Sequence, residues 1–250
     1  MKKIIILLAL ALLSVSSFAA ESSKMKQANE AYKAEKYALA DSLYTEVMNK
    51  EGVSSALYYN LGNAKYKQGE IAYAILYYEK ALKISPDNED AKYNLELAKS
   101  QTVDKIETME KFVLSEWNQS IQNGTSSNGW AKWSIFAFIL TLILIGLYIF
   151  STKVLMKKIA FFSAIVTLVF SIIAFGYAKA QNNAMTKDES AIIISPTITG
   201  KSTPDESGKD LFVLHEGTKV RIKSKIGDWV EIQMEDGNTG WVSSKKVEII

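Results

Sequence analysis

The sequence predicts a multidomain membrane protein built from an α-helical repeat solenoid, a two-helix transmembrane hairpin and a small all-β barrel. Three observations predict this class: helically spaced apolar residues over 20–100, two long uncharged apolar runs in mid-chain, and short alternating runs over 188–250. The 29 basic and 27 acidic residues give a net charge of +2, so nothing electrostatic favours a nucleic acid partner. Cysteine is absent and histidine occurs once, which excludes thiolate and multi-histidine metal sites, and we expect no cofactor.

The first segment, residues 1–19, has the pattern of a secretory signal peptide. Two lysines precede the apolar run Ile4–Leu13, and the small residues Ser17 and Ala19 fit cleavage after Ala19. An uncleaved anchor helix is the alternative, but ten apolar residues are too few to cross roughly 30 Å of hydrocarbon. We therefore expect the chain that follows to lie outside the cytoplasm.

A repeat with a period of about 34 residues precedes the membrane segment, with copies at 21–54 and 55–88. The second copy shows the pattern most fully, at Tyr58, Leu61, Gly62, Ala74, Tyr78, Ala81 and Pro86. This pattern resembles tetratricopeptide repeats. The first copy has Ala28 at the glycine position, and a third copy starts at Glu89 without completing, so we interpret it as a capping helix. Gly69 is expected in a turn with positive φ.

The resemblance to tetratricopeptide repeats implies a groove for peptides or proteins, lined by the first helix of each repeat. By position, the groove residues are Asn29, Tyr59, Asn63, Tyr66 and Lys67. The alternative is that the tyrosines pack between helices, which we expect for Tyr58 and Tyr78 and leave open for Tyr59 and Tyr66.

Some tetratricopeptide proteins clamp a C-terminal carboxylate with two asparagines and several basic residues. Asn29 and Asn60 fit the asparagine positions, but Met25, Asp90 and Asn94 stand where that clamp has lysine or arginine. We therefore expect no such clamp, and repeat architecture alone accounts for the two asparagines.

Residues 101–129 link the repeats to the first apolar run. The apolar residues Ile106, Met109, Val113, Trp117 and Ile121 recur every three or four positions and form one helical face. An amphipathic helix on the outer membrane leaflet fits this pattern, and packing of the same face on the last repeat helix is the alternative.

Two uncharged runs, Ser134–Phe150 and Ile159–Tyr177, are long enough to span a bilayer. We assign transmembrane helices to residues 130–151 and 159–178. The loop between them, residues 152–158, contains three lysines and is therefore expected in the cytoplasm, with both flanks outside.

The predicted hairpin has the features of an anchor. Trp130, Trp133 and Tyr177 lie where an outer interfacial belt is expected. Small polar residues recur every four positions on the second helix, which suits packing on the first; they are Ser163, Thr167 and Ser171. Neither run contains an acid, a base or an amide, so an anchor is favoured over a channel or pump.

Residues 188–250 predict short strands. Lys219–Lys223 and Val230–Met234 alternate with period two, turns are expected at Lys225–Asp228 and Glu235–Asn238, and Gly240-Trp241-Val242 opens the last strand. Together these segments resemble a bacterial SH3 domain, which implies a small barrel and, in many members, binding of cell-wall peptides or glycans.

Within the SH3-like segment, Trp229 and Trp241 are the candidate ligand-groove residues. Packing in the barrel is the alternative, and we favour it for Trp241. His215 stands beside Glu216, but a lone histidine without a nucleophile is expected to be structural.

The order of the segments is similar to that of BatE-type proteins, the E components of the Bacteroides aerotolerance (Bat) operon. The stretches that carry the similarity are YYNLGNAKYKQGEIAYAILYYEKAL, DAKYNLELAK, SSNGWAKWSIF and the SH3-like tail. The resemblance implies a cytoplasmic-membrane protein with periplasmic N- and C-terminal domains. It also implies von Willebrand-type membrane proteins of the same operon as partners and a link to oxygen stress, and it supplies no catalytic residue.

The sequence therefore predicts a membrane-anchored protein-interaction scaffold facing the periplasm. A peptidoglycan receptor acting through the SH3-like domain is the alternative. An enzyme is not expected, because the chain has no GxxxxGK nucleotide loop and few groups that would form a nucleophile–base pair.

Overall fold

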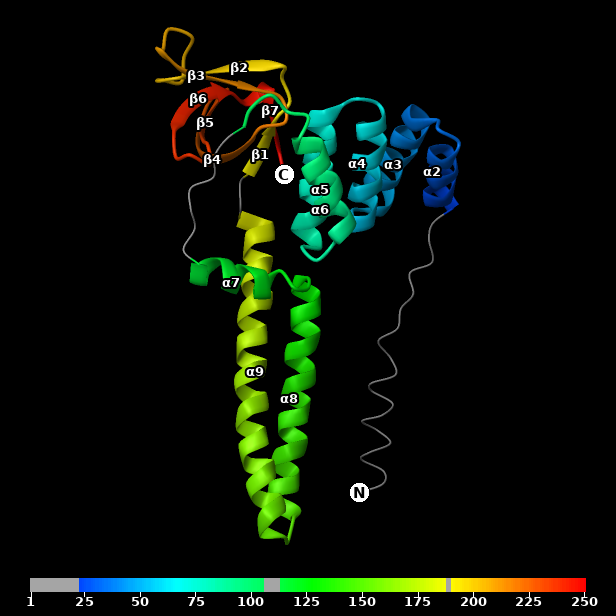
Figure 1. Cartoon of the computed structure of the whole chain (residues 1–250), viewed down its shortest axis with the longest axis vertical. Coiled ribbons are helices and arrows are strands. Elements are labelled where there is room, and N and C mark those ends of the chain that lie inside the picture. The colour runs from blue at the N-terminus through cyan, green and yellow to red at the C-terminus, as the bar shows by residue number, and fades with distance from the viewer. Residues whose placement is uncertain (1–22, 106–112, 188–189) are drawn as a thin grey trace. The chain divides into compact units, whose positions relative to one another are not determined.

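The structure, a computed structural model, describes residues 23–105, 113–187 and 190–250 (Figure 1). The predicted signal peptide at 1–19, and Ile106 and Met109 of the linker, lie outside the described residues. The chain divides between Glu51 and Gly52 into two compact units.

The first unit contains the helix pair α2 (Ser23–Lys33) and α3 (Tyr37–Glu51). Their buried residues are Ala28, Ala31, Ala40, Tyr44 and Val47. In the turn between them Glu35 has a φ of 59°, and Gly69, one repeat later, has a φ of 80°. The left-handed turn expected at Gly69 is thus confirmed, and the first repeat makes the same turn with a residue that adopts it less readily.

The second unit starts with the helix pair α4 (Ser55–Lys67) and α5 (Ile71–Ile84). Ser54 is the N-cap of α4, and its Oγ accepts a hydrogen bond of 3.1 Å from the main-chain nitrogen of Leu57. Gly62 lies under the ring of Tyr78, and a Cβ at this position would come within 2.6 Å of that ring. A side chain at position 62 would therefore displace the ring of Tyr78 from the place that it occupies here.

Helix α6 (Glu89–Lys99) follows. Its N-cap is Asn88, whose Oδ1 accepts a 3.0 Å hydrogen bond from the main-chain nitrogen of Ala91. One face of α6 is buried, through Ala91, Leu95 and Ala98. The opposite face includes Tyr93, which is 72% exposed. Glu96, at the position of Gly62 in the previous repeat, is exposed, so nothing there requires a small residue.

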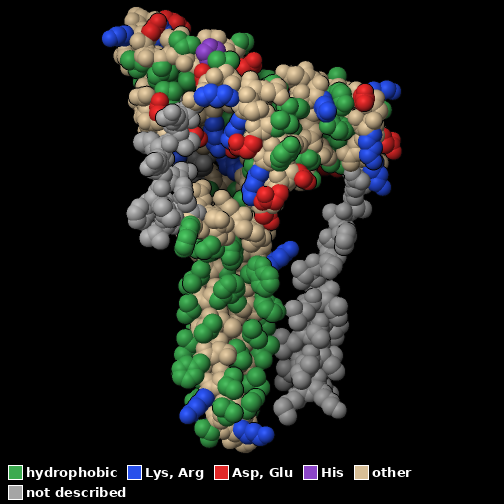
Figure 2. Space-filling view, in the orientation of Figure 1, with side chains coloured by type: hydrophobic (Ala, Val, Ile, Leu, Met, Phe, Trp, Pro, Cys, Tyr) green, Lys and Arg blue, Asp and Glu red, His purple; other side chains and the backbone are tan. Residues whose placement is uncertain are grey.

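Helix α7 (Val113–Gln122) leads to two long helices, α8 (Ser127–Phe150) and α9 (Val154–Lys187), and both of these are long and apolar enough to cross a membrane. Figure 2 shows hydrophobic side chains over their surface and lysines at the end where they are joined. The connection is shorter than the expected loop at 152–158, because α9 already begins at Val154 and continues well past 178. Residues 154–158 and 179–187, by which α9 exceeds the expected helix, contain no proline or glycine that would break it.

Hydroxyl groups join α8 to α9 along their length. Ser134 Oγ donates to the carbonyl of Ser171 at 2.9 Å, and the hydroxyls of Thr141 and Thr167 lie 2.8 Å apart. Thr167 and Ser171 of the expected small polar stripe thus contact the first helix. Such contacts suit helices that pack where no water is present to drive association.

The C-terminal part is an antiparallel sheet of seven strands, in the order β3-β2-β6-β5-β4-β1-β7. The strands are β1 (Ser190–Ile193), β2 (Thr197–Lys201), β3 (Asp210–His215), β4 (Lys219–Ile226), β5 (Trp229–Gln233), β6 (Thr239–Ser243) and β7 (Val247–Ile249). The predicted strands at 219–223 and 230–234 correspond to β4 and β5. Of the turn expected at 225–228, Gly227 and Asp228 form the turn, whereas Lys225 still belongs to β4. Strand β6 is not the last strand, because β7 follows it.

The expectation of a closed barrel is wrong: the sheet is open, with β3 at one edge and β7 at the other. Closure would require these two strands to pair. Strand β7 has only three residues, and its pairing is with β1. One face of β1 packs against helices of the same unit.

The core of the sheet comes from alternate residues of its strands, chiefly Ile193, Ile198, Val220, Ile232 and Val242. Phe212 on β3 lies across Gly200 and Gly240 of the neighbouring strands, and a Cβ at Gly240 would come within 2.8 Å of its ring. These two glycines make room for the aromatic ring.

Strand β1 is buried on both faces. Ala191 and Ile193 belong to the core of the sheet, whereas Ile192, 0% exposed, packs with Ile75 and Leu95 of the helices. One strand of four residues thus joins the core of the second repeat to the core of the sheet.

Candidate interaction surfaces

Each of the two repeats contains an equivalent tyrosine–asparagine hydrogen bond between its own two helices. In the first unit, the hydroxyl of Tyr44 donates to Asn29 Oδ1 at 2.6 Å. At the equivalent positions of the second repeat, the hydroxyl of Tyr78 donates to Asn63 Oδ1 at 2.7 Å. Both tyrosines are buried. The predicted groove residues Asn29 and Asn63 therefore also hold their own helix pairs together.

Asn63 is the centre of a network that joins three helices. Its Oδ1 also accepts a 2.8 Å hydrogen bond from Asn94 Nδ2 on α6, and the same Nδ2 lies 3.4 Å from the hydroxyl of Tyr59. Asn94 stands at a position where a carboxylate clamp has a basic residue, and here its amide binds within the chain. The structure thus brings Tyr59 and Asn63 together and adds Asn94, which the sequence indicated only as a clamp position.

The other predicted groove residues lie at the C-terminal end of α4. Tyr66 is half-buried, and its hydroxyl accepts a hydrogen bond of 2.5 Å from Gln101 Nε2. Lys67 is exposed. The rings of Tyr59 and Tyr66 both pack against the helical core while their hydroxyls reach polar partners, so packing and surface exposure are combined in each.

Trp229 and Trp241 lie on one face of the sheet. Trp229 pairs with Ser243, and Glu231 pairs with Trp241, so the two tryptophans are diagonal neighbours across β5 and β6. Both are half-buried, and their strand neighbours Val230 and Val242 point into the core. The carboxylate of Glu231 lies beside them and accepts a 2.8 Å hydrogen bond from Ser224. An aromatic pair with an adjacent carboxylate is suited to a planar or polyhydroxylated ligand.

His215 has a carboxylate partner from a distant part of the chain. Asp104 Oδ1 lies 2.8 Å from His215 Nδ1, and Asp104 Oδ2 accepts hydrogen bonds from the His215 main-chain nitrogen at 2.7 Å and from Thr218 Oγ1 at 2.6 Å. Burial would raise the pKa of Asp104, but the hydrogen bonds from Thr218 and His215 hold it below its ordinary value. This arrangement fastens the turn before β4 to the segment after α6, in keeping with a structural histidine.

Asp104 could not be predicted from the sequence, because its only signal was a polar position in the linker. Nothing local distinguishes it from the other acidic residues of that stretch, and its partners lie more than a hundred positions away.

A second polar contact joins the helices to the sheet. The carboxylate of Glu79 on α5 accepts from Lys219 Nζ of β4 at 2.7 Å and lies 3.4 Å from Lys99 Nζ of α6. Burial would raise the pKa of Glu79, but the charges of Lys219 and Lys99 outweigh it and lower that pKa below its ordinary value. Glu79 therefore remains ionised between two cations.

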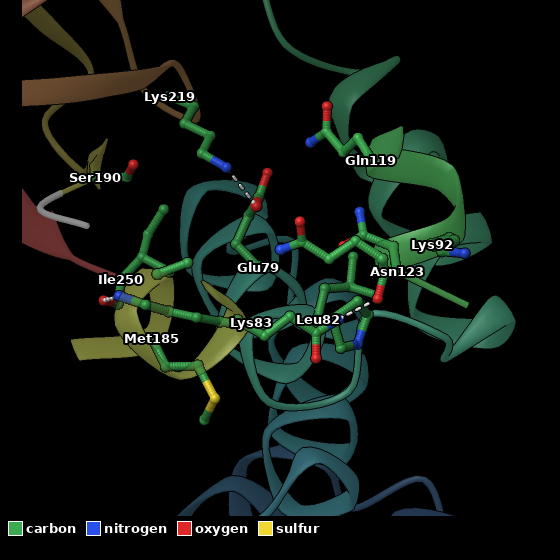
Figure 3. Close-up of a pocket in the computed structure, with 14 residues that line it drawn as sticks. Glu79, Leu82, Lys83, Lys92, Gln119, Asn123, Met185, Ser190, Lys219 and Ile250 are labelled. Carbon is green, nitrogen blue, oxygen red and sulfur yellow. Dashed lines mark hydrogen bonds and ion pairs between the residues drawn. The ribbon is translucent and has the colours of Figure 1, made fainter. Parts of the chain in front are cut away.

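A cavity of about 520 Å³ opens beside Glu79 (Figure 3). Its polar walls include Gln119 and Asn123, and its apolar walls include Leu82, Met185 and Ile250. The three lysines that line it all have partners: Lys219 binds Glu79, Lys83 binds the main-chain oxygen of Ile250, and Lys92 binds Glu89. The cavity is thus an open space of mixed polar and apolar lining and not a prepared site for an anion.

Among the residues that the structure describes, no group of three or more histidine, aspartate and glutamate side chains is placed to hold a metal ion. The two prominent carboxylates, Glu79 and Asp104, bind lysine, histidine and threonine groups of the chain itself.

Comparison with known protein families supports two of the domain types. A tetratricopeptide repeat family model matches residues 55–88, which are the second predicted copy, and a bacterial SH3 domain model matches residues 201–248. None of the curated proteins matches the chain. The chain therefore contains a tetratricopeptide repeat and a bacterial SH3 domain, on either side of two apolar helices that could span a membrane.

Proposed function

We propose that this protein is a membrane-anchored interaction scaffold of the bacterial cytoplasmic membrane, with both of its folded domains in the periplasm. The observation that carries the proposal is the path of the chain. Helices α8 and α9 are joined by three residues and lie side by side, so the segments before α8 and after α9 emerge at the same end (Figure 1). Two domain types that bind other molecules therefore share one side of any membrane that the hairpin crosses.

The partners that we propose are proteins. Tetratricopeptide repeats bind peptides and protein segments, and the resemblance to BatE-type proteins points to von Willebrand-type membrane proteins of an aerotolerance complex. We propose no catalytic role for the chain. Its most strongly paired carboxylates hold the domains together.

Peptidoglycan binding by the SH3 domain is the second candidate function. The specific observation in its favour is the pair of tryptophans, Trp229 and Trp241, on one face of the sheet beside Glu231. This function would place the main contact on the C-terminal domain instead of on the repeats.

In-cell crosslinking of the full chain with point variants separates the two functions. Deleting residues 20–100 is unsuitable, because it would uncover Ile192 of the sheet. We expect Lys67→Glu on the repeat surface to reduce recovery of membrane-protein partners several-fold and Trp229→Ala to leave it unchanged. Lys50→Glu, a matched charge reversal at the end of α3, is the control.

The scaffold proposal fails if Lys67→Glu and Lys50→Glu recover the same partners in the same amounts as the unmodified chain. Recovery of wall fragments that Trp229→Ala abolishes and Lys67→Glu does not affect would instead assign the main function to the SH3 domain. Circular dichroism of each purified variant establishes that the fold is retained.

A further inference from the structure

Helix α7 has two large apolar side chains exposed on the surface of the protein. Trp117 is 68% exposed and Ile121 is 55% exposed. They are four positions apart, so they lie on the same face of the helix. An exposed tryptophan and isoleucine together on a helix of ten residues indicate a surface that meets another apolar phase.

Hydrogen bonds from both long helices hold α7 in place. From α8, Trp130 Nε1 donates to the carbonyl of Gln122 at 2.8 Å. From α9, the hydroxyl of Tyr177 donates to Asn118 Oδ1 at 2.9 Å, and Gln181 Nε2 donates to the carbonyl of Gln122 at 2.5 Å. Helix α7 is thus fixed at the end of the hairpin, crosswise to α8 and α9 (Figure 1).

The depth of this end relative to a bilayer follows from the length of α8. Its 24 residues, at about 1.5 Å each, extend further than roughly 30 Å of hydrocarbon. The first turns of α8, which include Lys132, therefore lie in the headgroup region. Trp130 and Tyr177, whose rings are 5.1 Å apart, are of the residue types that gather there.

We propose that α7 is an interfacial helix that inserts Trp117 and Ile121 into the headgroup region of the lipid bilayer. The occupant of this face is lipid because α7 is hydrogen-bonded to the end of the hairpin, whose own exposed surface is apolar, at the depth of the aromatic pair Trp130 and Tyr177. The proposal rests on the proposed function in one respect, namely that the hairpin spans the membrane.

The chain contains no cysteine, so single cysteines can be introduced for spin labels without removing native ones. The full chain with Trp117→Cys, Ile121→Cys, Gln119→Cys or Ile143→Cys is reconstituted into vesicles of phosphatidylethanolamine and phosphatidylglycerol. Collision rates of each label with oxygen and with a water-soluble nickel chelate are measured. We expect the ratio of oxygen to nickel collisions to be several-fold higher at 117 and 121 than at position 119, an exposed control on the opposite face of α7.

Two results would overturn the proposal. Labels at 117 and 121 that collide with nickel as often as the label at 119 would place this face in water. Labels that are immobilised and shielded from both reagents would place it against protein. The label at position 143, on the exposed face of α8, tests the spanning hairpin separately, since frequent nickel collisions there would contradict the proposed function itself.

Discussion

Glu79 is a buried carboxylate whose partners come from two different domains. It accepts from Lys219 of the sheet and lies close to Lys99 of the last repeat helix. Removing a buried acid from between two cations leaves them without their counter-charge, and this costs more than the net contribution of the pair. The partial exposure of both lysines moderates that cost.

Glu79→Gln is expected to destabilise the full chain by about 1–3 kcal/mol at neutral pH. Because the folded-state pKa lies below the ordinary value of 4.5, the stabilisation is complete above pH 4.5 and is lost as pH falls through the lower folded value. The difference between the two proteins should therefore shrink in acid. Urea unfolding in detergent, followed by tryptophan fluorescence at neutral and at acidic pH, measures this difference in stability.

Glu89→Gln, at an exposed ion pair, is the control and should change stability by less than about 0.5 kcal/mol. A difference that persists unchanged in acid would contradict the assignment.

At the scale of elements, strand β1 is the link between the repeat and the SH3 domain. Short repeat arrays are marginal because each repeat gains stability from its neighbours. Here Ile192 packs among Ile75, Leu95 and Ala98, so the sheet supplies part of the covering that a further repeat would otherwise give to α5 and α6.

Ile192→Ala is expected to loosen the helices as well as the sheet. Truncation of a fully buried isoleucine costs about 2–5 kcal/mol, and this side chain packs within the helical core. Hydrogen exchange of the full chain in detergent should therefore speed up in peptides of α5 and α6. Ile249→Ala, at a side chain 56% exposed on the neighbouring β7, is the matched control and should leave these peptides unchanged. Faster exchange confined to the strands would show that the two domains are not coupled through β1.

Local chemistry made several of these features predictable from the sequence. Gly62 was recognised as a position of the repeat pattern, and the ring of Tyr78 occupies the space that a side chain there would need. Gly69 was expected in a left-handed turn because glycine adopts that conformation without strain. Repeat period and turn residues depend on neighbours in the chain, so a single sequence reveals them.

Features that depend on distant partners were not predictable in this way. The four residues of β1 form a short buried run with no alternation, which does not show that one face meets the sheet and the other the helices. Whether the two edge strands β3 and β7 pair also depends on residues far apart in the chain, and the prediction of a closed barrel was wrong. Asn63 and Asn94 each fitted a groove or clamp position, and only the fold shows that they bind one another.

At the scale of the whole molecule, the hairpin separates two ends of different character. The lysines of the α8–α9 connection lie at one end, and the repeat and SH3 domains are attached at the other. Positive charge near a membrane-spanning helix favours the cytoplasmic side, so in the proposed scaffold we expect both domains to face outward.

Single cysteines test this orientation directly. A membrane-impermeant maleimide applied to intact spheroplasts should label Lys26→Cys in α2 and Thr203→Cys in the loop after β2, whereas Lys153→Cys should react only after permeabilisation. All three positions are exposed, so accessibility to the reagent depends on the side of the membrane. Labelling of Lys153→Cys in intact spheroplasts, without labelling of the other two, would show the reverse orientation.

The double burial of β1 has a mechanical consequence. This strand is the first element after the long helix α9, so a load applied to the sheet, for example through the proposed cell-wall ligand, reaches α9 through β1. Strand β1 is paired on both sides, with β4 and β7, and its middle residue is embedded among the helices. A pull would therefore have to break two ladders of hydrogen bonds and a packed core together before the strand came free, which suits a tether that must hold under tension.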